Sequence, residues 1–191
     1  MKKCMIVVSI IISMFTVIWM QFNGDIPIIQ RAEASPIDRE LIVAVRQAPS
    51  TFDPWAPPNA YDTIGRNQVY DTLVCKDSKG QVIPSLAERY DVSSNGMVYT
   101  FHLKKGVKFT DGTELRASDV KFSIERAMQA PATKGYFSCI ENIDVVDEYT
   151  VKFNMKAPNV TLYEILFTWG QIVNEKVARE YGDRFGIALD S

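Results

Sequence analysis

The segment from Pro84 to Met128 constrains the fold more than any other part of the chain, because it encodes a hairpin followed by a helix. Tyr90–Val92 and Met97–Lys104 are rich in aromatic and β-branched residues, and the turn-forming sequence Ser-Ser-Asn-Gly separates them. Two antiparallel strands joined by a tight turn are therefore expected. Apolar residues alternate along the second strand, which predicts a sheet with one buried and one solvated face. These apolar residues are Tyr99, Phe101 and Leu103.

A helix is expected after the turn at Asp111 and Gly112, because apolar residues recur there at helical spacing. Asp119 falls in its first turn, where the helix dipole favours a carboxylate. A short strand over residues 107–109 is expected just before the turn. The apolar residues that define the helix are Val120, Ile124, Ala127 and Met128.

The same segment carries a family resemblance. Its motifs run in the order LAE, NG, YTFHL, KGVKF, DGTEL and DVKFSIER. This order resembles the signature region of the peptide/opine/nickel-binding family (solute-binding protein family 5) of ABC transporter substrate-binding proteins. The similarity extends from about Leu41 to the end of the sequence. Arg116 departs from the pattern, because relatives usually place a helix-capping Ser or Thr there; either Ser118 replaces that cap or the cap is weaker.

The resemblance implies an α/β fold of the periplasmic-binding-protein type (class II, type C). We expect this chain to hold the N-terminal part of the first lobe, with a β-hairpin subdomain, and the second lobe to be absent. The family's role implies an extracytoplasmic receptor that binds a short peptide or another small solute. It would deliver that solute to the permease of an ABC importer, whose ATPase is a separate chain. We expect no cofactor and a monomeric state.

The N-terminal segment predicts export. Two lysines precede the uncharged apolar run Cys4–Met20, and small residues occupy Ala34 and the position two before it, so cleavage before Ser35 is expected. An uncleaved anchor is the alternative, although this apolar run is shorter than the roughly 20 residues that a spanning helix needs. The chain thus divides into a signal peptide at residues 1–34 and a truncated solute-binding domain at 35–191. The expected location is the periplasm or the outer face of the cytoplasmic membrane.

Charge and cysteine content narrow the function classes. The formal net charge is −2, which argues against nucleic acid as a partner, because nucleic acid selects a basic face. Cys75 and Cys139 remain after the expected cleavage, and we expect two unpaired thiols that behave as small hydrophobic residues. A disulfide is the alternative, since an exported protein is permitted one.

Along the rest of the chain, Leu41–Val45 is expected to be a strand of a mostly parallel sheet, because five apolar residues lie between charged neighbours. Prolines then make residues 48–59 an irregular loop at the carboxyl end of that strand, where open α/β sheets bind ligands. The remaining expected elements are a helix at 61–71, strands at 73–75 and 82–83, an irregular segment at 131–139, a hairpin at 143–146 and 150–153, a helix from Pro158 to Phe167, and a helix from Glu175 to Tyr181 ended by Gly182.

No catalytic or metal-binding pattern is recognisable. His102 is the sole histidine, and no Gly-x-Ser-x-Gly elbow or phosphate-binding loop accompanies it. Asp111, Glu114 and Asp119 are acidic neighbours, but turn chemistry and a helix start explain them. We therefore expect a binding protein and not an enzyme. A lobe that binds a partner without binding solute, and a secreted hydrolase, are the alternatives.

Candidate solute-contacting residues lie in the loops that are expected to face the cleft. Core or loop packing is the alternative explanation for each of them, because aromatic side chains usually bury their surface for stability. The candidates are Asn59, Tyr61 and Asp62 after the proline-rich loop, Phe137 in the irregular segment, and Trp169 beside Gly170.

Overall fold

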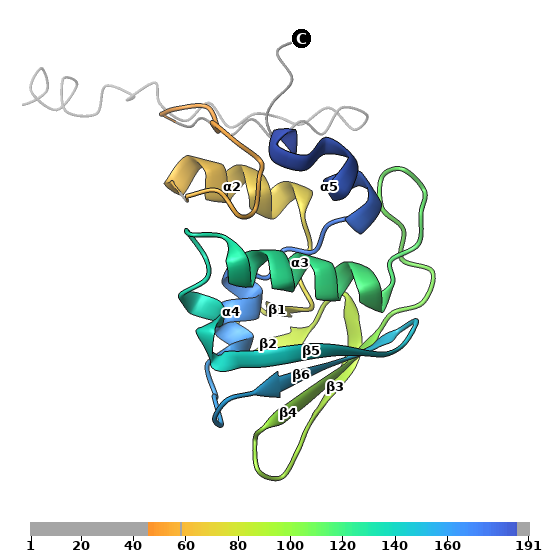
Figure 1. Cartoon of the computed structure of the whole chain (residues 1–191). Coiled ribbons are helices and arrows are strands. Elements are labelled where there is room, and N and C mark those ends of the chain that lie inside the picture. The colour runs from red at the N-terminus through yellow and green to blue at the C-terminus, as the bar shows by residue number, and fades with distance from the viewer. Residues whose placement is uncertain (1–45, 58, 187–191) are drawn as a thin grey trace, which may run out of the picture. The chain divides into compact units, whose positions relative to one another are not determined.

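The computed structural model describes residues 46–57 and 59–186, which form a four-stranded antiparallel sheet, a two-stranded sheet and flanking helices (Figure 1). The larger sheet has the strand order β3-β4-β6-β5. Its strands are β3 (Ala87–Val92), β4 (Val98–Leu103), β5 (Ile140–Asp147) and β6 (Thr150–Met155). Both predicted hairpins are therefore confirmed, and β4 and β6 pair to join them into one sheet. Strands β3, β5 and β6 are longer than expected, whereas β4 is one residue shorter at each end.

The alternation predicted for β4 is also confirmed. Tyr99, Phe101 and Leu103 are each at most 4% exposed. The neighbouring strand β6 repeats the pattern, and Phe101 meets Phe153 edge to face with ring centroids 5.3 Å apart. One face of the sheet thus forms an apolar layer of interlocking rings, which stabilises beyond the area buried.

Helix α3 (Ala117–Gln129) packs against β5 and β6 through the apolar stripe that the sequence predicts, and Val120, Ile124 and Ala127 are fully buried. The N-cap residue is Arg116 and its side chain makes no cap hydrogen bond, so the cap is the weaker one that the sequence allowed; Asp119, in the first turn, accepts the Arg116 N–H through its Oδ2 at 2.9 Å. Its Oδ1 accepts the Glu175 N–H at 2.9 Å, which ties α3 to the last helix.

The proline-rich loop is irregular as predicted, and helix α2 (Ala60–Val69) follows it. Strands β1 (Val74–Lys76) and β2 (Val82–Pro84) then form the expected hairpin around the turn at residues 77–80. Every strand pair in the described ranges is antiparallel. The predicted parallel-sheet strand Leu41–Val45 and the predicted cleavage point between Ala34 and Ser35 lie outside the described residues.

Two expected elements differ from the structure. Helix α4 (Leu162–Trp169) begins four residues after Pro158, because the Asn159 carboxamide accepts the Thr161 N–H at 2.8 Å and holds a turn there. The strand expected over residues 107–109 is only an isolated bridge between Lys108 and Glu114. Helix α5 (Glu175–Tyr181) ends at Gly182 as predicted.

The segment that follows α5 returns to the start of the described region. The Phe52 N–H donates to the Gly186 carbonyl at 2.7 Å, and the Thr51 hydroxyl donates to the same oxygen. Residues far apart in sequence are thereby hydrogen-bonded to each other.

Both cysteines predicted to be unpaired, Cys75 and Cys139, are free thiols. Burial raises the pKa of the Cys139 thiol, which keeps it protonated and poorly nucleophilic. Within the part of the chain that the structure describes, no helix combines the length and apolar character needed to cross a membrane.

Candidate functional site

Asn59 and Asp62 lie at the start of α2, where they contact each other. The Asn59 Oδ1 accepts the Tyr61 and Asp62 N–H groups at 2.9 and 2.8 Å and so caps the helix. Its amide nitrogen donates to Asp62 Oδ2 at 2.6 Å. Asp62 is 1% exposed, whereas Tyr61 is half-buried and keeps part of its ring at the surface.

Asp62 is the centre of a set of hydrogen bonds that fastens the proline-rich loop. Its Oδ1 accepts the Ser50 N–H at 2.6 Å and the Thr51 N–H at 3.4 Å, and the Ser50 hydroxyl lies 3.0 Å from Oδ2. With Asn59 included, this carboxylate is satisfied by the protein's own donors. Asn59 and Asp62 therefore fasten the loop to the start of α2. Asp62 is buried, whereas Asn59 is exposed and Tyr61 is half-buried.

Sequence reasoning missed Arg66, one helical turn after Asp62. It is 2% exposed, and its Nη1 donates to the carbonyls of Asp53 and Pro54 at 3.2 and 3.1 Å. Burial lowers the pKa of this guanidinium, and the nearby Asp62 and Asp53 oppose that effect. The sequence signal was available in principle, because an Asp and an Arg four apart on a helix face the same side.

Phe137 does not face a cleft. It lies in the short 3-10 helix η1 (Tyr136–Cys139) and is 0% exposed, so it belongs to the apolar core. The exposed aromatic residue of this segment is its neighbour Tyr136, at 47% exposure. The candidate in this segment is accordingly corrected from Phe137 to Tyr136.

Trp169 lies at the end of α4 and stacks on Tyr136, with ring centroids 4.8 Å apart and planes 10° from parallel. We call these two residues the aromatic pair. Trp169 is half-buried against the core. A Cβ at the following Gly170 would lie 2.5 Å from the Leu166 carbonyl oxygen, so glycine is needed to turn the chain directly after the ring. The predicted turn beside Trp169 is thus present, and the ring shares its surface with Tyr136.

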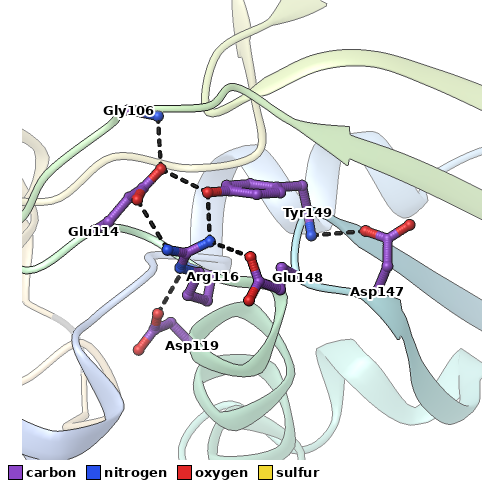
Figure 2. A network of polar contacts seen from close by, with 7 residues as sticks. All are labelled: Gly106, Glu114, Arg116, Asp119, Asp147, Glu148 and Tyr149. Carbon is purple, nitrogen blue, oxygen red and sulfur yellow. Dashed lines mark hydrogen bonds and ion pairs between the residues drawn. The ribbon is translucent and has the colours of Figure 1, made fainter.

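The acidic residues that could suggest catalysis or metal binding are tied into the fold. Figure 2 shows Glu114 accepting hydrogen bonds from the Gly106 N–H at 2.8 Å and the Tyr149 hydroxyl at 2.7 Å, while its other oxygen binds Arg116 at 2.9 Å. Arg116 also contacts the Tyr149 hydroxyl and binds Glu148 at 2.6 Å. This polar clamp joins the end of the β5–β6 hairpin to the start of α3.

The clamp also shifts the ionisation of its members. The hydrogen bond from Tyr149 is the main cause that lowers the pKa of Glu114, and the same bond raises the pKa of Tyr149. The His102 Nε2 lies 3.2 Å from Asp91 Oδ2 on the solvated face of the sheet, in a contact between two side chains at the surface. In residues 46–57 and 59–186, no group of His, Cys, Asp or Glu is arranged to hold a metal ion.

Comparison with known proteins shows which family the chain belongs to. Residues 81–187 match the family described as bacterial extracellular solute-binding proteins, family 5, middle part. Because that match spans more than half of the sequence, the chain belongs to this family, which consists of binding proteins and not enzymes.

Named relatives are similar over a limited part of their length. Di/tripeptide-binding protein 2 of Pseudomonas aeruginosa is 34% identical over 173 residues, which cover 76% of this chain and 32% of the relative. The glutathione-binding protein GsiB of Escherichia coli K12 is 30% identical over 155 residues, which cover 78% and 30%. The chain therefore spans about a third of the length of the curated relatives that it matches.

Solved structures confirm that the fold is a mixed α/β fragment of this family. The binding protein AgaA of A. tumefaciens R10, in complex with agropinic acid, superposes with a TM-score of 0.65 at 34% identity, covering 71% of this chain and 28% of AgaA. DppA of Helicobacter pylori, in complex with the peptide STSA, gives a TM-score of 0.62 at 28% identity, covering 70% and 30%.

Proposed function

We propose that this chain is the front part of an exported solute-binding protein that delivers short peptides to an ABC importer. The family match over residues 81–187 is the observation that carries the proposal. Peptides are favoured because relatives are named for di/tripeptides and for glutathione, itself a tripeptide, and a solved neighbour holds the peptide STSA. Agropinic acid and Ni(L-His), bound in other neighbours, define the competing ligand classes.

In this proposal the aromatic pair and Tyr61 contact the solute. Small-ligand sites are lined mainly by apolar and aromatic groups with few polar partners, and the stacked rings of Tyr136 and Trp169 offer such a surface. Asn59 and Asp62 act indirectly, because their hydrogen bonds hold the loop next to Tyr61 in place.

The lobe by itself is proposed to bind weakly. The chain spans about a third of its relatives' length, so a site built from it alone would leave much of a peptide in water. Only a small surplus would then remain over the entropy cost of association. We expect a dissociation constant no tighter than about 1 mM, near −4 kcal/mol.

The experiment is a titration of the exported chain with di- to tetrapeptides, followed by NMR chemical-shift changes that detect weak binding. Glutathione, agropinic acid and Ni(II)–histidine are titrated in parallel. Peptides should give the largest chemical-shift changes. These changes should be smaller in the variant Trp169→Ala. They should be unaffected in the control variant Tyr181→Ala, at an exposed tyrosine of α5. A response to agropinic acid or Ni(II)–histidine alone would reassign the ligand class, and micromolar peptide binding would refute the incomplete-site proposal.

A partner-binding lobe without solute is the second candidate. It is favoured if the folded chain responds to none of these ligands. Export is tested separately by intact-mass analysis of the secreted protein. Loss of residues 1–34 is expected, whereas a membrane-bound species that retains residues 5–20 would support the anchor.

A further inference from the structure

A second surface, formed by helices α3 and α5, has the character of a binding site. Helices α3 and α5 enclose an open groove of about 510 Å³ that is lined by Phe122 and Arg126 of α3 and by Arg179 of α5, among others. Its walls hold two arginines whose guanidinium groups both lie over aromatic rings. We call it the arginine groove.

Arg126 is held in place by its surroundings. Its guanidinium lies 4.4 Å from the ring centroid of Trp55, and its Nη2 donates to the Gly182 carbonyl at 3.3 Å. Trp55 is itself fixed, because it is 5% exposed and its indole N–H donates to the Ser123 carbonyl at 3.1 Å. The Nε and Nη1 of Arg126 have no hydrogen-bond partner among the described residues, so this cation is positioned with donors to spare.

Arg179 is positioned in the same way from the other wall. Its guanidinium lies 4.7 Å from the ring centroid of Phe122, and its Nε and Nη2 both bind Glu175 at 2.8 Å. For its Nη1 the described part of the chain supplies no partner. The two aromatic supports touch each other, because Phe122 meets Trp55 edge to face at 6.3 Å. Both cations therefore rest on one continuous aromatic floor.

The charge of the groove is opposite to that of the chain as a whole. The protein carries a formal net charge of −2, yet the groove is lined by two arginines, Arg126 and Arg179, and one acidic residue, Glu125; Arg179 is also paired with Glu175, which is not one of the lining residues. The Glu125 carboxylate lies 3.6 Å from Lys121, which offsets its charge. Arginine forks held in a fixed plane match the geometry of carboxylates.

From this arrangement we propose that the arginine groove binds an acidic segment of a partner protein through two or more of its carboxylates. A lone carboxylate would gain little, because the Arg179 side chain is 65% exposed and exposed ion pairs contribute little each. Carboxylates spaced along one chain can engage both guanidinium groups together, so the second contact adds to the first without a further association cost. This surface shares no residue with the proposed solute site.

The test uses the exported chain and two capped hexapeptides, one of glutamate and one of glutamine. Fluorescence anisotropy should show that the glutamate peptide binds at about 20 mM salt and that binding weakens at about 300 mM salt, where screening is strong. The glutamine peptide should not bind. Equal binding of both peptides would overturn the proposal.

Two variants assign the binding to the groove. Arg179→Gln removes a guanidinium whose side chain is 65% exposed, and combined with Arg126→Gln it should weaken glutamate-peptide binding at least tenfold. The matched control Arg89→Gln, at an exposed arginine on β3, should change it less than twofold. If the double variant loses its fold by circular dichroism, Arg179→Gln alone decides, with a threefold or greater loss expected.

A competition experiment with small anions tests whether the groove binds a protein segment or free anions. Citrate or inorganic phosphate at the same charge concentration should displace the peptide at least tenfold less effectively than unlabelled glutamate peptide. Equal displacement would overturn the proposal of a protein segment and leave a site for free anions. Unchanged binding in the double variant would overturn the site itself.

Discussion

The sheet layer and the loop–helix region before it are held together by different kinds of contact. In the sheet layer the buried groups are apolar rings and branched chains, such as Phe101, Phe153 and Ile143. In the region of residues 50–66, the central buried groups are the charged side chains Asp62 and Arg66, which bind the backbone around them. Apolar contacts are non-directional and partly interchangeable, whereas a buried hydrogen-bond network depends on every member being satisfied.

The largest effect is expected from Phe153→Ala in the sheet layer. Phe153 is 0% exposed, and its loss should remove both apolar burial and the edge-to-face contact with Phe101. The free energy of unfolding should fall by about 3 to 5 kcal/mol. Urea denaturation measures it. The matched control is Val92→Ala, at a 43% exposed position of the same sheet, which should stay within about 0.5 kcal/mol of the parent.

The second test moves to the polar region. Asp62→Asn keeps the side chain's shape but turns one oxygen into a donor, which then faces the donors of Ser50 or Asn59. The expected loss is about 2 to 3 kcal/mol, because hydrogen bonds to a charged group are broken in a buried place. Asp91→Asn, at an exposed carboxylate on β3, is the control. Equal effects of the two changes would show that the loop–helix region does not depend on its buried carboxylate.

This contrast also explains what could be predicted from sequence. The hairpins and α3 follow from local alternation, from the Asn95–Gly96 turn and from helical spacing, so their burial pattern was predictable. The contacts of Asp62 and Arg66 join segments that the local pattern does not connect, and α2 has only a weak apolar period to orient it. Their burial therefore depends on tertiary structure.

For the candidate site as well, local sequence patterns identified some residues and could not identify others. Trp169 was found because a glycine and the end of an apolar helix adjoin it in sequence. The sequence could not choose between Tyr136 and Phe137, because a four-residue 3-10 helix shows no period that tells which of two adjacent rings is buried. The start of α4 was missed for a related reason, since the side chain of Asn159 competes with the helix for backbone N–H groups.

A third change tests whether Trp169 contributes to stability in the way that the apolar residues of the sheet layer do. Trp169→Ala should lower the free energy of unfolding by about 1 kcal/mol or less, because the ring is half-buried and stacks on the exposed Tyr136. A packed core tryptophan would cost about 3 to 5 kcal/mol. Thermal and urea denaturation distinguish the two. A loss of core size would assign Trp169 to packing and remove it from the proposed solute surface.

The smallest effect is expected at the polar clamp, and it should disappear in acid. The folded-state pKa of Glu114 is lowered, so its stabilising contribution is present above the unfolded pKa and is lost as pH falls through the folded pKa. Glu114→Gln should therefore be less stable than the parent at about pH 6, and the two should converge towards about pH 3. Urea midpoints across this range measure it.

Two further variants separate the clamp from general charge effects. Tyr149→Phe removes the hydrogen bond that is the main cause of the lowered pKa, so it should shift the acid transition of the parent to higher pH. Glu141→Gln is the control, at an exposed glutamate on β5. A constant difference between Glu114→Gln and the parent at every pH would show that the clamp acts through packing and not through ionisation.

The hydrogen bond between Phe52 and Gly186 holds two segments that are far apart in sequence at backbone contact distance. A Cβ at Gly186 would come 2.1 Å from the Asp53 nitrogen, and the φ of Gly186 is +74°, a conformation that residues with a side chain rarely adopt. Any other residue at position 186 would therefore have to push the loop at residues 52–53 away and break this contact, so a single glycine decides how closely the proline-rich loop and the segment after α5 can approach.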